Sequence, residues 1–536
     1  MKRMTWSFLL FATALTAQPP CAIRGIVVDA LTNQPLPRTR VFAEIDSDSD
    51  NNSSPPVRQI TDASGNFCFE KLAAGEYAVR ASRAYYIDAQ YGEHWHGAPG
   101  HLLEISPDDP GPAITIKIAP QAIISGMLVD ADGDPLQGAQ IELLKGRWKK
   151  RKLISASIQK MTTDDSGRYR FAGLTAGTYF LRAIPASLRD GPFFLPQFLD
   201  QVRQSLRQTE SKTYYRDALS FREATPIQVS AGQEVDSLTL TFHVTEARHV
   251  SGQVAPEALN TSPRIVYLSE EDSSGPEDRL SVPIQSDGHF LTDDLSPDRY
   301  LIRGPAVVSK IIDLTEGDID DLVLESNQPI EFGITVHLQG ARSLRSLALL
   351  DRTPGIDEDL RSIKAQLITE DRFKVAVHPG QYEIVPGGDG SLYFIKSLVV
   401  GGEPQQRNIL DLQGGAQKSI DLFLSPNPAS VAGRVISNQP IKEEVTLLLE
   451  NESDPESYST KTSGPDGFQW TLLQAGKYRL YAFEEWTRDI WETPGLAALL
   501  AAKSAVLDVK EGQHQHINVP LISIEDLQST LKRTNF

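Results

Sequence analysis

One pattern recurs five times along this chain and constrains its fold more than any other feature of the sequence. Each copy combines a turn led by Asp, a strand with alternating aromatic or apolar residues, and a second turn that leads into a Tyr and another alternating strand. The tyrosines are Tyr77, Tyr179, Tyr300, Tyr382 and Tyr478, and 102, 121, 82 and 96 residues separate them. Each interval is the length of one small β-domain.

The first two copies, Asp62–Ala81 and Asp165–Ala183, are nearly superimposable and show the physical basis of the pattern. Gly65 and Gly167 suit hairpin turns, because glycine adopts positive φ without steric cost. The alternation that follows gives each strand one apolar face. The Tyr after the second turn is similar to the tyrosine corner of β-sandwiches, in which the hydroxyl binds a nearby backbone group.

A matching opening strand precedes each copy, and an alternating closing strand follows it. The closing strands include Ile114–Ile118 and Leu238–Phe242. The opening strands share a central Gly and are Ile23–Val27, Ile124–Leu128, Val250–Val254, Phe332–Val336 and Val431–Val435. We therefore predict an all-β fold, a tandem array of about five small antiparallel β-sandwiches with short helical insertions. Such helices are expected before Tyr214 and at Leu496–Ala502.

The opening strand, the Asp134–Leu136 turn and the Gly-x-Tyr closure together resemble the carboxypeptidase regulatory-like domain. Residues 121–185 resemble it most and residues 22–81 nearly as well, whereas the third and fifth copies are weaker and the fourth is recognised by its position. The resemblance implies a seven-stranded, transthyretin-like (prealbumin-like) sandwich of the carbohydrate-binding-like fold group. It implies little about function, because the matching residues are turns and core.

The N-terminus predicts export. Lys2 and Arg3 precede the apolar stretch Trp6–Leu15, and Ala17 suits signal peptidase, as in a cleaved secretory signal. The protein is therefore expected to be secreted, periplasmic or at the cell envelope. The predicted organisation is a signal peptide at 1–17, β-sandwiches at 18–120, 121–246 (with an insertion near 185–226), 247–327, 328–427 and 428–522, and a tail at 523–536.

The charge balance excludes two classes of partner. Lys and Arg number 52 against 70 Asp and Glu, for a formal net charge of −18, so nucleic acid and anionic lipid would be repelled. After the signal segment, no apolar run approaches the roughly 20 residues of a membrane span. Glycans or envelope proteins remain as expected partners, and the oligomeric state is left open.

Aromatic residues in one loop region are the best indication of a binding site. Tyr85, Tyr86, Tyr91 and Trp95 lie close together in the sequence with His94. Sugars bind by stacking on aromatic rings, which makes these four residues a candidate carbohydrate site. The alternative is that the rings cover the edge of the sandwich as a small additional core.

Catalytic and metal-binding patterns are weak. His101–Glu104 and His243–Glu246 match the His-x-x-Glu of zinc carboxypeptidases, but a zinc site needs a third ligand and an open position in a preorganised pocket. His94 and His96 could bind a transition metal, although a polar surface loop is the favoured interpretation. We predict a protein that is not an enzyme, with no metal site and no cofactor.

The two cysteines, Cys21 and Cys68, both lie in the first predicted sandwich. In an exported chain they would form a disulfide across about 47 residues, and otherwise they would be two buried thiols.

Three functional hypotheses follow. The first is a non-catalytic array of carbohydrate- or protein-binding modules at the cell envelope. The second is a purely structural spacer or scaffold. The third is an inactive region related to the accessory domains of zinc carboxypeptidases.

Overall fold

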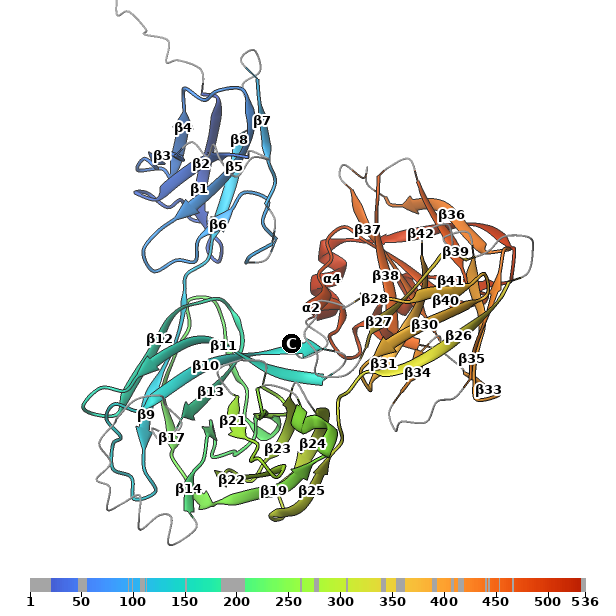
Figure 1. The fold of residues 1–536 in the computed structure, drawn as a ribbon. Helices are drawn as coiled ribbons and strands as arrows, with labels where there is room; N and C mark the ends of the chain where they lie inside the picture. The colour runs from blue at the N-terminus through green and yellow to red at the C-terminus, as the bar shows by residue number, and fades with distance from the viewer. Residues whose placement is uncertain are drawn as a thin grey trace, which may run out of the picture. The chain divides into compact units, whose positions relative to one another are not determined.

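The protein is all-β, as the sequence predicts (Figure 1). The signal segment, Trp95 and most of the insertion after Ile184 lie outside the residues that the structure describes. The computed structural model describes residues 21–46, 55–94, 96–98, 100–106, 111, 113–149, 152–184, 208–260, 263–273, 279–304, 307–338, 344–352, 362–387, 393–405, 409–412, 419–438, 441, 444–452, 454–464 and 467–531.

The chain divides into two compact units. The first comprises residues 1–125, 170–177 and 228–238, and the second comprises residues 126–169, 178–227 and 239–536. The sandwich boundaries given above remain predictions. We use segments 1 to 5 as names for the ranges 18–120, 121–246, 247–327, 328–427 and 428–522.

Segment 1 forms two facing sheets around one core. Their strand orders are β4-β1-β8 and β3-β2-β5-β6, and β7 also pairs with β5. Inward-facing residues such as Val27, Phe69 and Val79 are buried in the core between the sheets. The strands are β1 (Ile23–Asp29), β2 (Arg40–Ile45), β3 (Val57–Ile60), β4 (Asn66–Phe69), β5 (Gly75–Ser82), β6 (Ala89–Gln90), β7 (Leu103–Ile105) and β8 (Ala113–Ile118).

Segment 2 contains a three-stranded sheet in the order β12-β9-β17 and a larger sheet in the order β11-β10-β13-β15, with β16 beside β13. A short pair, β14 with β18, leads out of the segment. Its elements are β9 (Ala122–Val129), β10 (Gln140–Lys149), β11 (Lys152–Thr162), β12 (Arg168–Leu174), β13 (Gly177–Ile184), β14 (Gln208–Glu210), β15 (Thr213–Tyr214), the 3-10 turn η2 (Phe221–Glu223), β16 (Ile227–Val229), β17 (Glu234–Thr241) and β18 (Val244–Glu246).

Segment 3 repeats the two-sheet arrangement, with strand orders β22-β19-β25 and β21-β20-β23-β24. Its core includes Val250, Phe290 and Ile302. The elements are β19 (Arg248–Val254), the 3-10 turn η3 (Pro256–Asn260), β20 (Ile265–Glu270), β21 (Leu280–Pro283), β22 (His289–Leu295), β23 (Arg299–Gly304), β24 (Val307–Asp313) and β25 (Ile319–Leu324).

Segment 4 has a core cluster that includes Ile334, Phe373 and Leu422. Its sheets have the orders β29-β30-β26-β35-β32-β33 and β28-β27-β31-β34. The strands are β26 (Ile330–Leu338), β27 (Ser346–Asp351), β28 (Ser362–Lys364), β29 (Gln366–Thr369), β30 (Arg372–Val377), β31 (Gln381–Gly387), β32 (Phe394–Val400), β33 (Glu403–Gln405), β34 (Ile409–Asp411) and β35 (Ile420–Ser425).

Segment 5 closes its two sheets through one long strand, because β42 pairs first with β36 and then with β40. Its elements are β36 (Ala429–Ile436), β37 (Val445–Asn451), β38 (Asp454–Ser463), β39 (Phe468–Leu473), β40 (Gly476–Phe483), α2 (Arg488–Trp491), α3 (Leu496–Leu500), the 3-10 turn η6 (Ala501–Lys503), β41 (Ala505–Val509) and β42 (His514–Ile522).

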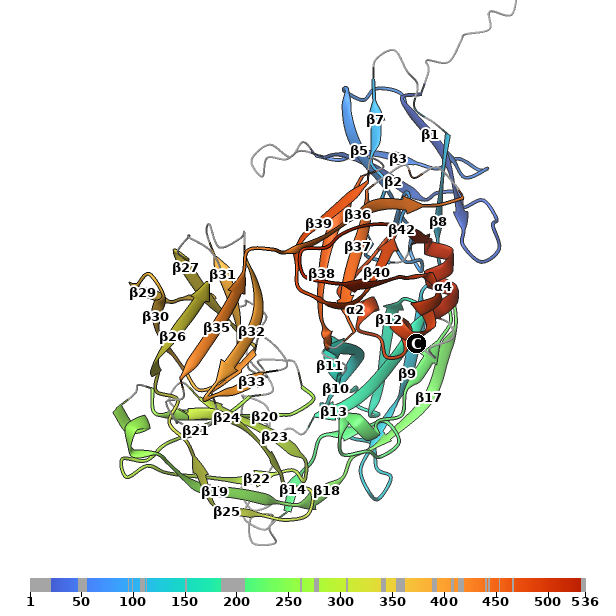
Figure 2. The ribbon, with the colours of Figure 1, turned by 90° about the vertical axis from the view of Figure 1, so that its right-hand side faces the viewer.

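The α-helices of the described residues lie in segment 5 and just after it. The helix predicted at Leu496–Ala502 is present as α3 and η6, with Leu496 and Leu500 buried. A further helix, α4 (Ile524–Leu531), occupies the predicted tail and lies beside this segment (Figure 2). Its Leu527 is buried. The helix expected before Tyr214 falls outside the described residues.

The opening and closing strands of four segments pair in parallel, a feature that alternation alone does not predict. The pairs are β1 with β8, β19 with β25, β26 with β35 and β36 with β42. The central Gly of the opening strand makes the close approach possible in segments 3 and 5. A Cβ on Gly252 would lie 2.1 Å from the carbonyl oxygen of Leu322, and one on Gly433 would lie 1.6 Å from that of Ile517.

The predicted tyrosine corner is confirmed in four copies of the repeat. In each, the Tyr hydroxyl donates to the backbone carbonyl four residues earlier, and this bond holds the turn before the strand. The pairs are Tyr77 with Ala73 (3.2 Å), Tyr300 with Ser296 (3.0 Å), Tyr382 with His378 (2.8 Å) and Tyr478 with Gln474 (3.1 Å).

Candidate functional sites: an aromatic loop and a buried ionic junction

Two of the predicted aromatic site residues in segment 1 pack against the core. Tyr86 and Tyr91 are partly buried against the core of that segment. The Tyr86 hydroxyl donates to Oδ2 of Asp29 at 2.9 Å, and the Arg83 guanidinium lies 5.6 Å from the Tyr86 ring centre. The Tyr91 ring meets His101 edge-on at 6.0 Å. These contacts fix both rings in place.

The Tyr86–Asp29 hydrogen bond also sets the electrostatics of this edge. Burial raises the pKa of Tyr86, and the Asp29 carboxylate raises it further. Burial alone would raise the pKa of Asp29, but hydrogen bonds from Thr32, Tyr86 and Leu31 hold it below its ordinary value. The pair therefore stays as a phenol and a carboxylate at neutral pH.

Tyr85 is the predicted ring that faces solvent. Its side chain is 79% exposed, and its backbone adopts a left-handed conformation with a φ of 69°. Such a conformation is uncommon for a bulky residue and presents the ring outward. Of the predicted set, Tyr85 thus has a ring free to stack on a ligand, and Trp95 is not described.

The predicted histidines lie in ordinary local contacts. His94 and His101 meet edge-on with ring centres 5.8 Å apart. His96 Nδ1 lies 3.6 Å from Glu93 Oε1, and His243 Nε2 lies 3.4 Å from Asp217 Oδ1.

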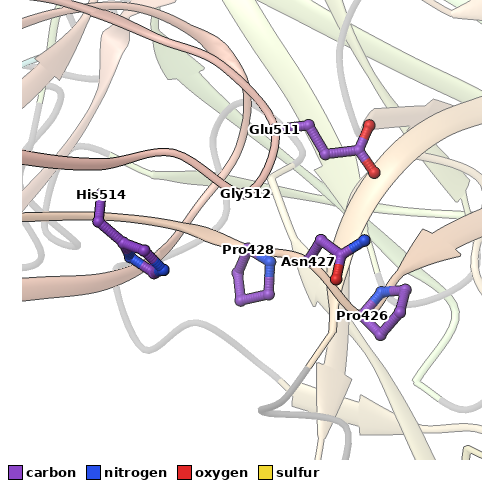
Figure 3. Close-up of a pocket in the computed structure, with 6 residues that line it drawn as sticks. All are labelled: Pro426, Asn427, Pro428, Glu511, Gly512 and His514. Carbon is purple, nitrogen blue, oxygen red and sulfur yellow. The ribbon is translucent and has the colours of Figure 1, made fainter.

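A shallow pocket lies at the joint between segments 4 and 5 (Figure 3). Its volume is about 620 Å³, and it is lined by Pro426, Asn427, Pro428, Glu511, Gly512 and His514. The polar side chains of this pocket are bonded to neighbouring residues of the same joint. Glu511 accepts a hydrogen bond from Ser425 at 2.6 Å and pairs with Lys396, and His514 Nδ1 lies 2.7 Å from the Ser430 hydroxyl.

The most unusual chemistry in the structure is a set of eight charged side chains between segments 2 and 3, six of them buried, all within the second compact unit. We call it the ionic junction, and its residues are Glu142, Lys160, Arg182, Lys212, Arg222, Glu270, Asp272 and Asp298. Sequence reasoning missed it. Buried charges of this kind are rare unless they are paired.

The segment 2 side of the junction is an ion pair across neighbouring strands. Glu142 on β10 is fully buried, and Arg182 on β13 is 1% exposed. Arg182 donates to Oε2 of Glu142 through both Nε and a terminal nitrogen, and Lys160 Nζ lies 3.0 Å from Oε1. Burial alone would raise the pKa of Glu142, but Arg182 and Lys160 together lower it. Glu142 is therefore a carboxylate.

Arg182 also approaches a carboxylate of segment 3. Arg182 lies 4.0 Å from Oε2 of Glu270, and Lys212 Nζ lies 3.0 Å from Oε1 of the same carboxylate. The backbone is joined as well, because the amide of Ser155 on β11 donates to the carbonyl of Asp272 at 2.9 Å. Two consecutive segments are thus connected by buried polar bonds rather than by a linker alone.

Glu270, Asp272 and Asp298 form a tight group at the segment 3 side, which we call the carboxylate cluster. One oxygen of each lies within 4.8 Å of the others, and the residues are 6%, 1% and 2% exposed. Burial, Glu270 and Asp272 raise the pKa of Asp298 to about 7. Burial likewise raises the pKa of Tyr214 and Tyr300 beside the cluster.

These observations define the class of protein as a tandem array of β-sandwiches with tyrosine corners. Two parts of the chain, residues 22–96 and 123–189, match the carboxypeptidase regulatory-like domain family. The first two copies of the repeat thus match the domain family that the repeat resembles. No curated protein matches it.

Solved structures give only distant similarity. The minor pilin GBS52 of Streptococcus agalactiae is 13% identical, with 42% of this chain and 97% of the pilin covered and a TM-score of 0.21. The TIE protein of Bacillus anthracis is 9% identical, with 75% and 73% covered and a TM-score of 0.16. The shaft pilin SpaA of Lactobacillus rhamnosus GG is 12% identical, with 41% and 96% covered and a TM-score of 0.18. At these scores no property is transferred to this chain.

Proposed function

We propose that this protein is an exported, non-catalytic scaffold that holds β-sandwiches in fixed succession for protein–protein contacts at the cell envelope. The observation that carries the proposal is the ionic junction. It joins segments 2 and 3 through the buried Arg182 and through the Ser155–Asp272 backbone bond. A flexible string of binding modules has no need of such a connection.

Two further features support export. Cys21 and Cys68 form a disulfide with a Cα–Cα distance of 5.4 Å, and such bonds persist in oxidising compartments. The N-terminal segment has the order of a secretory signal. Within the described ranges, no helix has the length and hydrophobicity of a membrane span.

The scaffold proposal is tested by measuring the distance between segments 2 and 3 in solution. Spin labels at Ser166→Cys and Ser286→Cys, both exposed turn positions, report this distance by pulsed dipolar spectroscopy in the full mature chain. We expect one narrow distance distribution that broadens when Arg182→Met is added. A broad distribution in the unmodified background would contradict a rigid pair.

Carbohydrate binding is the second candidate function, and the observation that favours it is the exposed ring of Tyr85. A glycan array with the mature chain, with and without calcium, tests it. Saturable binding that Tyr85→Ala abolishes, and that Tyr86→Phe retains, would support a sugar site at this loop. A blank array with folded protein would leave the scaffold proposal.

A further inference from the structure

In the part of the chain that the structure describes, one oxygen atom of the carboxylate cluster has no hydrogen bond. Asp298 is 2% exposed, and among the described residues its Oδ2 has no hydrogen-bond partner. Its other oxygen, Oδ1, accepts the Arg299 amide at 2.7 Å and lies 3.7 Å from a terminal nitrogen of Arg222. A buried carboxylate oxygen without a donor is costly, unless a cation or a proton satisfies it.

The cations described beside the cluster differ in how firmly they are held. Lys212 is bonded to Glu270, and Arg182 is engaged by Glu142. Arg299 is paired with Glu271 at 3.1 Å. Arg222 lies 3.5 Å from Asp272, 3.6 Å from Glu271 and 3.7 Å from Asp298, distances longer than those of charge-assisted hydrogen bonds. Among the described residues, Arg222 is therefore the loosely held cation at this cluster.

One member of the cluster borders a pocket. Asp298 and Arg222 line a pocket of about 450 Å³ together with Ser220, Pro297 and Thr315. The Arg222 side chain is 38% exposed, so it can turn outward through this opening. A small ion then has a path to Asp298 at the point where the arginine now stands.

We propose that Glu270, Asp272 and Asp298 bind a divalent cation of the calcium or magnesium class, and that the ion takes the place of Arg222. All three ligands are oxygens, which these hard cations prefer. Calcium–oxygen distances of about 2.3–2.6 Å allow two ligand atoms on one ion to lie up to about 5 Å apart, in keeping with the observed 4.8 Å limit.

The cation site goes beyond the proposed scaffold function. Because the site lies in the ionic junction, ion binding would also affect the connection between segments 2 and 3. The ion would bind carboxylates of segment 3 and displace a side chain of segment 2, so cation concentration would adjust the connection between the two segments. The test of the ion and the test of the rigid pair use different measurements, and either can fail alone.

The experiment is a titration of the EDTA-treated mature chain with Ca²⁺, Mg²⁺ and Mn²⁺ by isothermal calorimetry, with thermal unfolding as a second readout. We expect one saturable site for at least one of the ions and a higher melting temperature for segments 2 and 3. Asp298→Asn should weaken binding about tenfold or more, because it removes one of three charged ligands. Asp287→Asn, an exposed turn acid of the same segment, is the matched control and should change nothing.

Arg222→Gln separates this proposal from a purely structural role for the arginine. If the ion competes with Arg222, the variant should bind about threefold to tenfold more tightly than the unmodified chain. If Arg222 only stabilises the junction, the variant should melt earlier and show no gain in affinity. The proposal is overturned when neither chain binds any of the three ions, or when binding survives Asp298→Asn unchanged.

Discussion

The backbone amide of Ser155 donates to the carbonyl oxygen of Asp272 at 2.9 Å, although 117 residues separate the two. The Ser155 hydroxyl donates to the same oxygen at 3.2 Å. Ser155 lies on an edge strand of segment 2 and Asp272 follows a strand of segment 3. Segment 3 thus satisfies polar groups of segment 2, and the two segments should unfold together.

The buried ion pair of Glu142 and Arg182 should be sensitive to loss of one partner. We expect Arg182→Met to destabilise the joint transition of segments 2 and 3 by about 3–5 kcal/mol, because it leaves a buried carboxylate without its guanidinium. Adding Glu142→Met should recover most of that loss. Scanning calorimetry of the single and double variants measures both effects. A double variant as unstable as the single one would show that packing, and not charge, is at fault.

The same pair predicts a dependence of stability on pH. Because Arg182 and Lys160 lower the pKa of Glu142 below the ordinary value of 4.5, ionised Glu142 stabilises the folded state fully above pH 4.5. This contribution is lost as pH falls below 4.5 and through the pKa of the folded state. Melting temperatures from pH 7 to pH 3 should show a gap between the unmodified chain and Glu142→Gln that narrows below pH 4.5. A gap that is constant with pH would contradict the assignment.

The opening-strand glycines offer a matched pair of substitutions. Gly433→Ala should lower the stability of segment 5 by about 1–3 kcal/mol, because the new methyl group meets the backbone carbonyl of Ile517. Gly333→Ala in segment 4 should cause no comparable loss, since its Cβ would lie 3.8 Å from the carbonyl oxygen of Phe373, an ordinary van der Waals distance. Calorimetry of the two variants decides the matter, and equal losses would refute the steric explanation.

The tyrosine corners can be tested by removing one hydroxyl. Tyr382→Phe should destabilise segment 4 by about 0.5–1.5 kcal/mol, because the carbonyl of His378 loses its donor at 2.8 Å. A change of that size lowers the melting temperature of a domain of this length by several degrees. Tyr85→Phe, at the exposed ring, serves as the control and should leave the melting curve unchanged.

The disulfide between Cys21 and Cys68 should stabilise segment 1 alone. It joins the start of the opening strand to β4 across a sequence separation of 47, for which the loop-entropy model gives about 3–4 kcal/mol. Reduction should therefore lower the melting temperature of segment 1 and leave the other transitions in place. A chain carrying Cys21→Ala and Cys68→Ala should not respond to the reductant.

Residues that act locally were predictable from the sequence. The Asp-led turns behave as expected, since Asp62 Oδ1 accepts the amides of Ser64 and Asn66 at 2.8 Å. The tyrosine of each corner likewise binds a carbonyl group only four residues earlier in the chain. The parallel partner of each opening strand was not predictable, because alternation looks the same in a strand whose neighbour runs either way.

The ionic junction could not be predicted because its partners are far apart in the chain. Arg182 and Glu142 are 40 residues apart, and Tyr214 and Glu270 are 56 apart. One signal was available, since Glu142 stands between Ile141 and Leu143 in a strand whose neighbours are buried. Similarly, Tyr86 could not be assigned to the core without its partner Asp29, which lies 57 residues away.

The parallel pairing of opening and closing strands determines how a segment bears mechanical force. In segment 1 the chain enters through β1 and leaves through β8, and these strands lie side by side and run in the same direction. A pull on the two ends therefore slides one strand along the other and loads all the hydrogen bonds between them at once. In segment 5 the β36–β42 pair has the same geometry. Segments with this geometry should therefore resist stretching. An antiparallel hairpin pulled at its open end would instead lose its hydrogen bonds one at a time.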